Sequence, residues 1–132
     1  MIGLDTNILL RLFLKDDPAQ AAKVTALLGR LGETGPGYVN CLTLMEFAWF
    51  LRRRVKLPRE TVMESVSDLL DVDDIVIEDE PLIEETLSEM ARSNAEFQDV
   101  FIALRNRQAG CVSTKTFDAR AAARIPGMEL LS

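Results

Sequence analysis

Apolar residues along the chain follow two patterns that alternate. Short continuous apolar runs predict buried strands, and apolar residues that recur every three or four positions predict amphipathic helices. We expect strands at residues 1–5, 38–42, 74–79, 111–114 and 128–131. We expect helices at residues 6–14, 17–31, 43–55, 57–71, 80–93, 97–110 and 118–125. This alternation predicts an α/β fold, a three-layer α/β/α sandwich with a mainly parallel central sheet.

Local signals predict where several elements begin and end. Asp17 suits the N-cap of a helix, with Pro18 in its first turn and Gln20 at the third helical position. The glycines and proline of residues 32–37 predict a loop, and Gly110 predicts the end of the helix before it. A chain of 132 residues without repeats or a linker suits one domain, so we expect residues 1–132 to form a single domain.

Composition narrows the class of protein. The chain is 48% hydrophobic, and no apolar run approaches the roughly 18 residues that a membrane span needs. The first residues lack the basic start and cleavage site of a signal peptide, and two cysteines make no disulfide framework. We therefore expect a reduced, cytoplasmic protein that does not contact membranes.

The chain contains no histidine. This absence excludes Ser-His-Asp and Cys-His catalysis, histidine-ligated zinc and RNA cleavage by paired histidines. Any chemistry must then use carboxylates, hydroxyl groups, lysine, arginine or a bound hard metal ion.

Charge is distributed unevenly along the chain. The net charge of −6 argues against a general nucleic-acid binder, which is normally basic. Residues 60–91 hold 12 acidic and no basic residues, which predicts solvated helix faces. The preceding basic run of residues 52–59 is suited either to a solvated face or to a phosphate backbone.

Four acidic residues lie close to predicted strand ends or helix starts: Asp5, Glu46, Asp99 and Asp118. Ligands of parallel α/β sheets bind beyond the carboxyl ends of the strands. Each acid also has a structural explanation. Asp5 and Asp118 suit helix N-caps, residues 43–46 match a capping box that would place Glu46 in a first turn, and Asp99 suits a helix dipole.

Two of these acids lie in strongly apolar segments. Glu46 is the only ionisable residue between Cys41 and Leu51, and Asp99 lies among Phe97 and residues 100–102. Both carboxylates are therefore predicted to be buried, where an unpaired charge is costly. If several acids converge, a cation relieves their repulsion, and oxygen ligands alone favour Mg²⁺ or Mn²⁺.

Four segments of the sequence resemble PIN-domain ribonucleases in order and spacing, most closely the VapC-type toxins of toxin–antitoxin systems. These segments are residues 1–11, 43–60, 97–111 and 116–131. The resemblance runs from Met1 to Leu131. It implies a PIN-like, Rossmann-like fold and hydrolysis of RNA phosphodiester bonds with Mg²⁺, or Mn²⁺ as a substitute.

The resemblance also implies roles for individual residues. Asp5, Asp99 and Asp118 match the acidic metal ligands, and Glu46 matches the acid that holds a metal-bound water or orients the nucleophile. The supporting positions are Thr6 and Asn7 beside the first acid, the hydroxyl of Thr116, and Lys115, a departure from the family pattern that adds a basic group. A second departure is Gln98, where the family often has a small residue.

The family likeness further implies two protein partners. One is a second copy of the chain in a homodimer. The other is a cognate antitoxin whose C-terminal segment occupies the active-site groove.

Three other functions compete with this interpretation. A haloacid-dehalogenase-like phosphatase needs a second aspartate two positions after the first, where this chain has Asn7. A phospho-accepting receiver domain needs adjacent acids after its first strand. A catalytically silent PIN fold that only binds proteins is disfavoured by the complete set of four acids.

Overall fold

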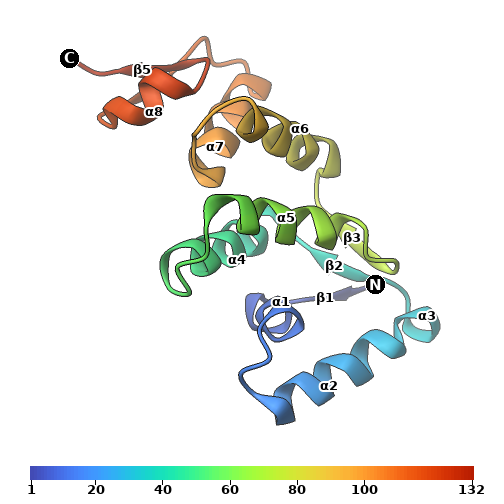
Figure 1. Ribbon diagram of the computed structural model, residues 1–132. Coiled ribbons are helices and arrows are strands. Elements are labelled where there is room, and N and C mark those ends of the chain that lie inside the picture. The colour runs from blue at the N-terminus through green and yellow to red at the C-terminus, as the bar shows by residue number, and fades with distance from the viewer. The chain divides into compact units, whose positions relative to one another are not determined.

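The computed structural model describes residues 1–132. The chain divides into two compact units, Met1–Glu78 and Asp79–Ser132, and each is described separately (Figure 1). The prediction that the whole chain forms one domain stays a prediction.

The first unit is built on three short parallel strands and five helices. Its elements, in chain order, are β1 (Ile2–Gly3), α1 (Thr6–Phe13), α2 (Pro18–Gly29), α3 (Leu31–Thr34), β2 (Gly37–Val39), α4 (Cys41–Arg53), α5 (Arg59–Leu70) and β3 (Ile75–Ile77). The strands pair in the order β1-β2-β3, with Gly37 beside both Ile2 and Ile75. A Cβ atom at Gly37 would lie 2.7 Å from Cδ1 of Leu4, so this register favours glycine.

Apolar faces of the helices form the core of the first unit. Helix α1 packs against α2 and α4, and α4 packs against α5 (Figure 1). Leu9, Leu44 and Val66 from three of these helices are fully buried. The rings of Phe13 and Phe47 lie 5.2 Å apart between centroids and join α1 to α4.

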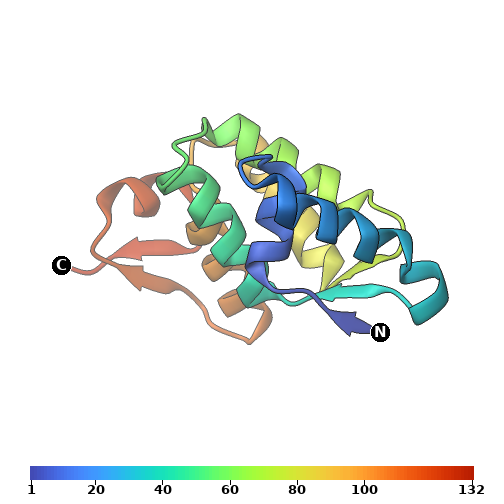
Figure 2. The same ribbon diagram turned by 90° about the horizontal axis from the view of Figure 1, so that it is seen from below.

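The second unit pairs two long helices and then adds a small parallel sheet. Its elements are α6 (Glu80–Ala91), α7 (Phe97–Gln108), β4 (Thr114–Thr116), α8 (Ala119–Arg124) and β5 (Met128–Leu130). Helices α6 and α7 pack against each other, and α8 packs on the β4–β5 pair (Figure 2). Asn106 at the end of α7 donates from Nδ2 to Oγ1 of Thr114, at 3.0 Å, and so ties α7 to β4.

The prediction of an α/β fold built on a mainly parallel sheet is confirmed, because every strand pair in the structure is parallel. None of the helices is both long enough and apolar enough to cross a membrane. Cys41 and Cys111 are both free thiols.

The predicted element boundaries differ most from the structure in three places. The loop predicted at residues 32–37 begins inside helix α3, where the amide of Gly35 donates to the carbonyl of Leu31. Strand β2 ends at Val39 rather than at residue 42, because α4 already begins at Cys41. The strand predicted at 111–114 begins only at Thr114, because the amide of Cys111 still donates back to α7.

Candidate functional site

Asp5 lies directly after β1 and begins helix α1. Its backbone is extended, and its Oδ1 accepts a hydrogen bond of 2.8 Å from the amide of Thr6, which makes it the N-cap of α1. The side chain is exposed, and the amide of Leu4 is fixed by the carbonyl of Tyr38 in β2. The cap uses Oδ1 and leaves Oδ2 for another ligand, so capping and metal binding are compatible at Asp5.

Glu46 lies in α4, and three predictions about it were wrong. The side chain is exposed rather than buried. The N-cap of α4 is Asn40, whose Oδ1 accepts from the amide of Thr43 at 2.8 Å, so Thr43 does not form a capping box with Glu46. Glu46 therefore lies beyond the first turn of the helix, on a solvent-facing surface. Because the Glu46 carboxylate is exposed, no cation is needed to offset the cost of burying its charge.

Helix α4 is fixed at its first residue by a side chain that the sequence did not single out. Oε1 of Glu78, just after β3, accepts from the amide of Cys41 at 2.8 Å, and the thiol of Cys41 donates to the carbonyl of Glu78 at 3.3 Å. Burial raises the pKa of the nearby Tyr38, and Glu78 and Cys41 add to this increase. The only signal in the sequence was an acid at the end of a strand-like run, which does not identify its partner.

Asp99 lies in the first turn of α7, as predicted. Its neighbours Phe97 and Val100 are buried, but the Asp99 side chain is only half-buried and Ile102 is exposed. Asp99 therefore lies at the border of the apolar face and not inside the core. An acid in a first helical turn also interacts favourably with the helix dipole.

Asp118 and Thr116 form one hydrogen-bonded turn between β4 and α8. Oδ1 of Asp118 accepts from the amides of Arg120 and Ala121, at 2.9 and 3.1 Å, which confirms Asp118 as the N-cap of α8. Oγ1 of Thr116 accepts from the amide of Asp118 at 3.0 Å. Thr116 therefore fixes the backbone of Asp118, and its supporting role at the site stays a prediction.

The other supporting positions differ in their surroundings. The side chain of Thr6 is buried, while Asn7 is exposed. Lys115 lies opposite Glu129 in β5, and its ammonium is 2.6 Å from the Glu129 carboxylate. Successive side chains of a strand point to opposite faces, so Lys115 points away from the face of Thr116. Lys115 thus has a structural partner, and its role at the site stays a prediction.

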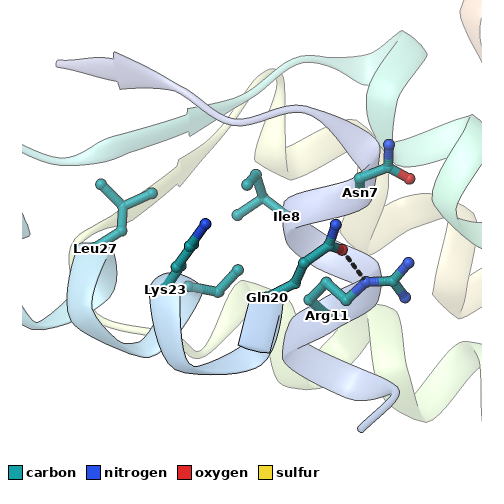
Figure 3. Close-up of a pocket in the computed structure, with 7 residues that line it drawn as sticks. Asn7, Ile8, Arg11, Gln20, Lys23 and Leu27 are labelled. Carbon is teal, nitrogen blue, oxygen red and sulfur yellow. Dashed lines mark hydrogen bonds between the residues drawn. The ribbon is translucent and has the colours of Figure 1, made fainter. Parts of the chain in front are cut away.

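A groove of about 340 Å³ lies between α1 and α2 in the first unit (Figure 3). Its apolar lining comes from Ile8, Val24 and Leu27. Asn7 and Arg11 lie along the same helix face, and Nε of Arg11 donates to Oε1 of Gln20 at 2.6 Å. The groove begins two residues after Asp5 and can receive an apolar side chain beside polar groups.

The four acids are divided between the two units: Asp5 and Glu46 lie in the first, Asp99 and Asp118 in the second. Neither unit alone gathers three acidic or cysteine side chains into a metal-binding group. The donor chemistry nevertheless fits Mg²⁺ or Mn²⁺, because all four side chains are carboxylates, exposed or half-buried, and such ions keep several water ligands.

The sequence profile of the PIN domain family matches residues 2–127. This match covers nearly the whole chain and all four acids, and the chain therefore belongs to the PIN domain family. PIN domains are generally nucleases and typically use divalent metal ions, so the chain has a nuclease-type fold. No curated protein matches the chain.

Proposed function

We propose that this protein is a metal-dependent endoribonuclease and the toxin of a VapBC-type toxin–antitoxin pair. The observation that carries the proposal is the PIN-family match over residues 2–127, which includes all four acids expected of the active site. The absence of histidine from the chain supports metal-dependent rather than histidine-dependent RNA cleavage.

In this proposal Asp5, Asp99 and Asp118 hold Mg²⁺, with Mn²⁺ as a substitute. A divalent ion, when bound, lowers the pKa of water and offsets negative charge on the phosphate. The exposed carboxylate of Glu46 would hold a metal-bound water or orient the attacking water. Thr116 holds Asp118 in position through the Asp118 amide, and the buried Thr6 fixes the start of α1 beside Asp5.

The net charge of −6 also supports a site that depends on metal ions. Four carboxylates repel an RNA phosphate, and a bound divalent cation would offset part of that negative charge. The acidic residues of α5 and α6 are mostly exposed, as predicted for solvated helix faces, and we assign them no part in RNA binding.

We further propose that the protein acts in the cytoplasm as a homodimer under the control of a cognate antitoxin. The groove between α1 and α2 supports the antitoxin part of the proposal, because its apolar lining lies beside Asn7, two residues after Asp5. A C-terminal antitoxin segment with an apolar side chain is suited to this groove.

The test compares RNA cleavage by matched substitutions. Purified, antitoxin-free protein is incubated with RNA in Mg²⁺, Mn²⁺ or EDTA, as wild type, Asp5→Asn and Asp99→Asn. The control for Asp5→Asn is Asp17→Asn, because Asp17 caps α2 through Oδ1 just as Asp5 caps α1. The control for Asp99→Asn is Glu60→Gln, an acid in the first turn of α5.

We expect cleavage only with a divalent metal ion, its loss in Asp5→Asn and Asp99→Asn, and its retention in both controls. Cleavage that survives EDTA or both test substitutions would contradict the nuclease site. For the toxin role, induced expression of wild type should arrest growth, and Asp99→Asn should not. Growth arrest by both proteins would contradict toxicity through RNA cleavage.

A further inference from the structure

One face of helix α4 carries an unusual set of exposed side chains. Leu42, Glu46, Trp49 and Arg53 follow one another at intervals of four, three and four residues, which places them on one side of a helix. All four are exposed, and Trp49 keeps 44% of its surface accessible. Trp49 is the only tryptophan of the chain. A large aromatic side chain in this position is not explained by packing of the core.

Basic residues follow Trp49 in the sequence at the end of the helix. The guanidinium carbon of Arg54 lies 5.8 Å from the centroid of the Trp49 ring, a cation–π contact. Arg53, Arg54 and Lys56 are all exposed, and no ion pair joins any of them to an acid. Four residues, Trp49, Arg53, Arg54 and Lys56, are called the basic aromatic patch from here on. In a protein with a net charge of −6, three unpaired cations within four residues form a local concentration of positive charge.

Several other basic residues of the chain are already neutralised by acids. Arg11 pairs with Asp16, Arg105 with Asp79 and Lys115 with Glu129. The charges of the basic aromatic patch are therefore available to an external partner. The charges of the paired residues are already offset by acids. Its chemistry fits a strand of RNA, since cations follow the phosphates and aromatic rings stack on unpaired bases.

We infer that the basic aromatic patch holds single-stranded RNA next to the bond that is cut, an inference that rests on the proposed nuclease function. Glu46 lies on the same helix face, and at about 1.5 Å per residue Arg53 is about 10 Å further along α4. A stacked strand that rises about 3.4 Å per nucleotide covers that length with about three nucleotides. One base stacks on Trp49, and Arg53, Arg54 and Lys56 contact phosphates beyond it.

Stacking on an aromatic ring tolerates any base. The patch therefore supplies affinity and orientation for single-stranded RNA and does not select a sequence. Double-stranded RNA, whose bases are stacked on each other, should bind much less well.

Binding is measured in EDTA, so that it does not depend on cleavage. The probe is an oligouridylate of about eight nucleotides, within the ~4–16 typical of single-strand sites. We expect it to quench the emission of Trp49 in the wild type. Anisotropy of a labelled probe should show about tenfold weaker binding for Trp49→Ala, and near wild-type binding for Trp49→Phe, which keeps a ring.

Charge is tested with Arg53→Ala and Arg54→Ala. Each should lower the affinity and reduce the slope of log K against log salt by about 0.7. The control is Arg92→Ala, since Arg92 is exposed but already pairs with Glu89. Unchanged binding in both Trp49→Ala and Arg53→Ala would overturn the patch. The proposal would also be overturned if Trp49 emission changed with protein concentration and not with RNA. That result would assign this face of α4 to contact with a second copy of the chain.

These outcomes separate the patch from the nuclease site. If the oligouridylate binds as expected but no variant, wild type included, cleaves RNA in Mg²⁺ or Mn²⁺, the proposed nuclease function fails and the patch stands. If wild type cleaves RNA, and both Trp49→Ala and Arg53→Ala bind and cleave it equally well, the patch fails and the nuclease function stands.

Discussion

At the scale of single residues, the candidate acids combine structural and chemical roles. Asp5 and Asp118 each cap a helix through Oδ1, so a simple alanine substitution removes a cap and a charge together. The two roles separate when the substitution keeps the oxygen acceptor. Asparagine does this, because its side-chain carbonyl still accepts a hydrogen bond from a backbone amide.

We predict different effects of Asp118→Asn and Asp118→Ala. Asp118→Asn keeps the bonds to the amides of Arg120 and Ala121, so its free energy of unfolding should fall by no more than a few tenths of a kcal/mol. Asp118→Ala should lose about 1 kcal/mol, because α8 loses its N-cap. Urea denaturation measures both values.

RNA cleavage in Mg²⁺ should be lost in both variants of Asp118. The control is Asp17→Asn, which keeps the cap of α2 and lies outside the proposed site. If Asp118→Asn cleaved RNA at the wild-type rate, Asp118 would be a helix cap without a role in the reaction.

The sequence predicted the helix caps at Asp5, Asp17 and Asp118 correctly, because a cap depends on residues a few positions apart. The burial of Glu46 was predicted wrongly for the opposite reason. Its segment is apolar in composition, but Leu42 and Trp49 lie on the exposed face with Glu46, and only the fold shows which face is covered. The solvent exposure of a side chain, and its hydrogen bonds to residues far away in the sequence, cannot be deduced from a single segment.

At the scale of elements, helix α4 shows how local and distant signals compete. The residues 43–46 match a capping box, but Asn40 caps the helix three residues earlier, and Glu78 from the end of β3 accepts from Cys41. The sequence could predict that a helix follows β2. It could not predict the hydrogen bond between Cys41 and Glu78, because these residues lie 37 positions apart.

We predict that Glu78→Ala lowers the free energy of unfolding by about 1 kcal/mol, because the amide of Cys41 loses its acceptor. Glu78→Gln should have a smaller effect, since its side-chain carbonyl can still accept that bond. Thermal and urea denaturation test the difference. The control is Glu64→Ala on the exposed surface of α5, which should stay within about 0.5 kcal/mol of wild type. Equal losses in Glu64→Ala and Glu78→Ala would contradict a specific role of Glu78.

We also predict that Tyr38 ionises at a higher pH in the folded protein than in the unfolded chain. Burial is the main cause of the raised pKa, and Glu78 and Cys41 add to it. The fold favours the neutral phenol, so this stabilisation is complete below the ordinary pKa of about 10 and is lost as pH rises through the folded value. Tyr38 is the only tyrosine, so tyrosinate absorbance measures both titrations directly.

Urea-unfolded protein provides the reference titration for Tyr38. Glu78→Gln should lower the folded pKa of Tyr38 only in part, because burial remains. Identical titration midpoints in the folded and unfolded protein would contradict the effect of burial on Tyr38.

At the scale of the whole molecule, the sequence predicted the α/β class and the parallel pairing from the alternation of its elements. It also predicted the acidic surface of α5 and α6, since charge composition needs no tertiary information. The division into Met1–Glu78 and Asp79–Ser132 has no counterpart in the sequence, which contains no linker between these units.

We predict that the two units unfold in one cooperative transition, as expected of a single domain. The second unit is too small to bury much of its surface, since a domain of about 60 residues buries only about 60%. Its sheet has two strands of three residues each, and two-stranded sheets are marginally stable in water. The emission of Trp49 reports on the first unit, and a dye on the exposed Cys111 reports on the second.

Labelling is specific to Cys111 in the folded protein, because Cys41 is buried. Urea transitions followed by Trp49 emission, by the dye and by far-ultraviolet circular dichroism should coincide, which is the test of a two-state transition. A dye transition at lower urea than the Trp49 transition would show that the second unit unfolds first. In that case residues 1–132 would contain two separately unfolding domains, and substitutions at Asp118 would change the stability of only one of them.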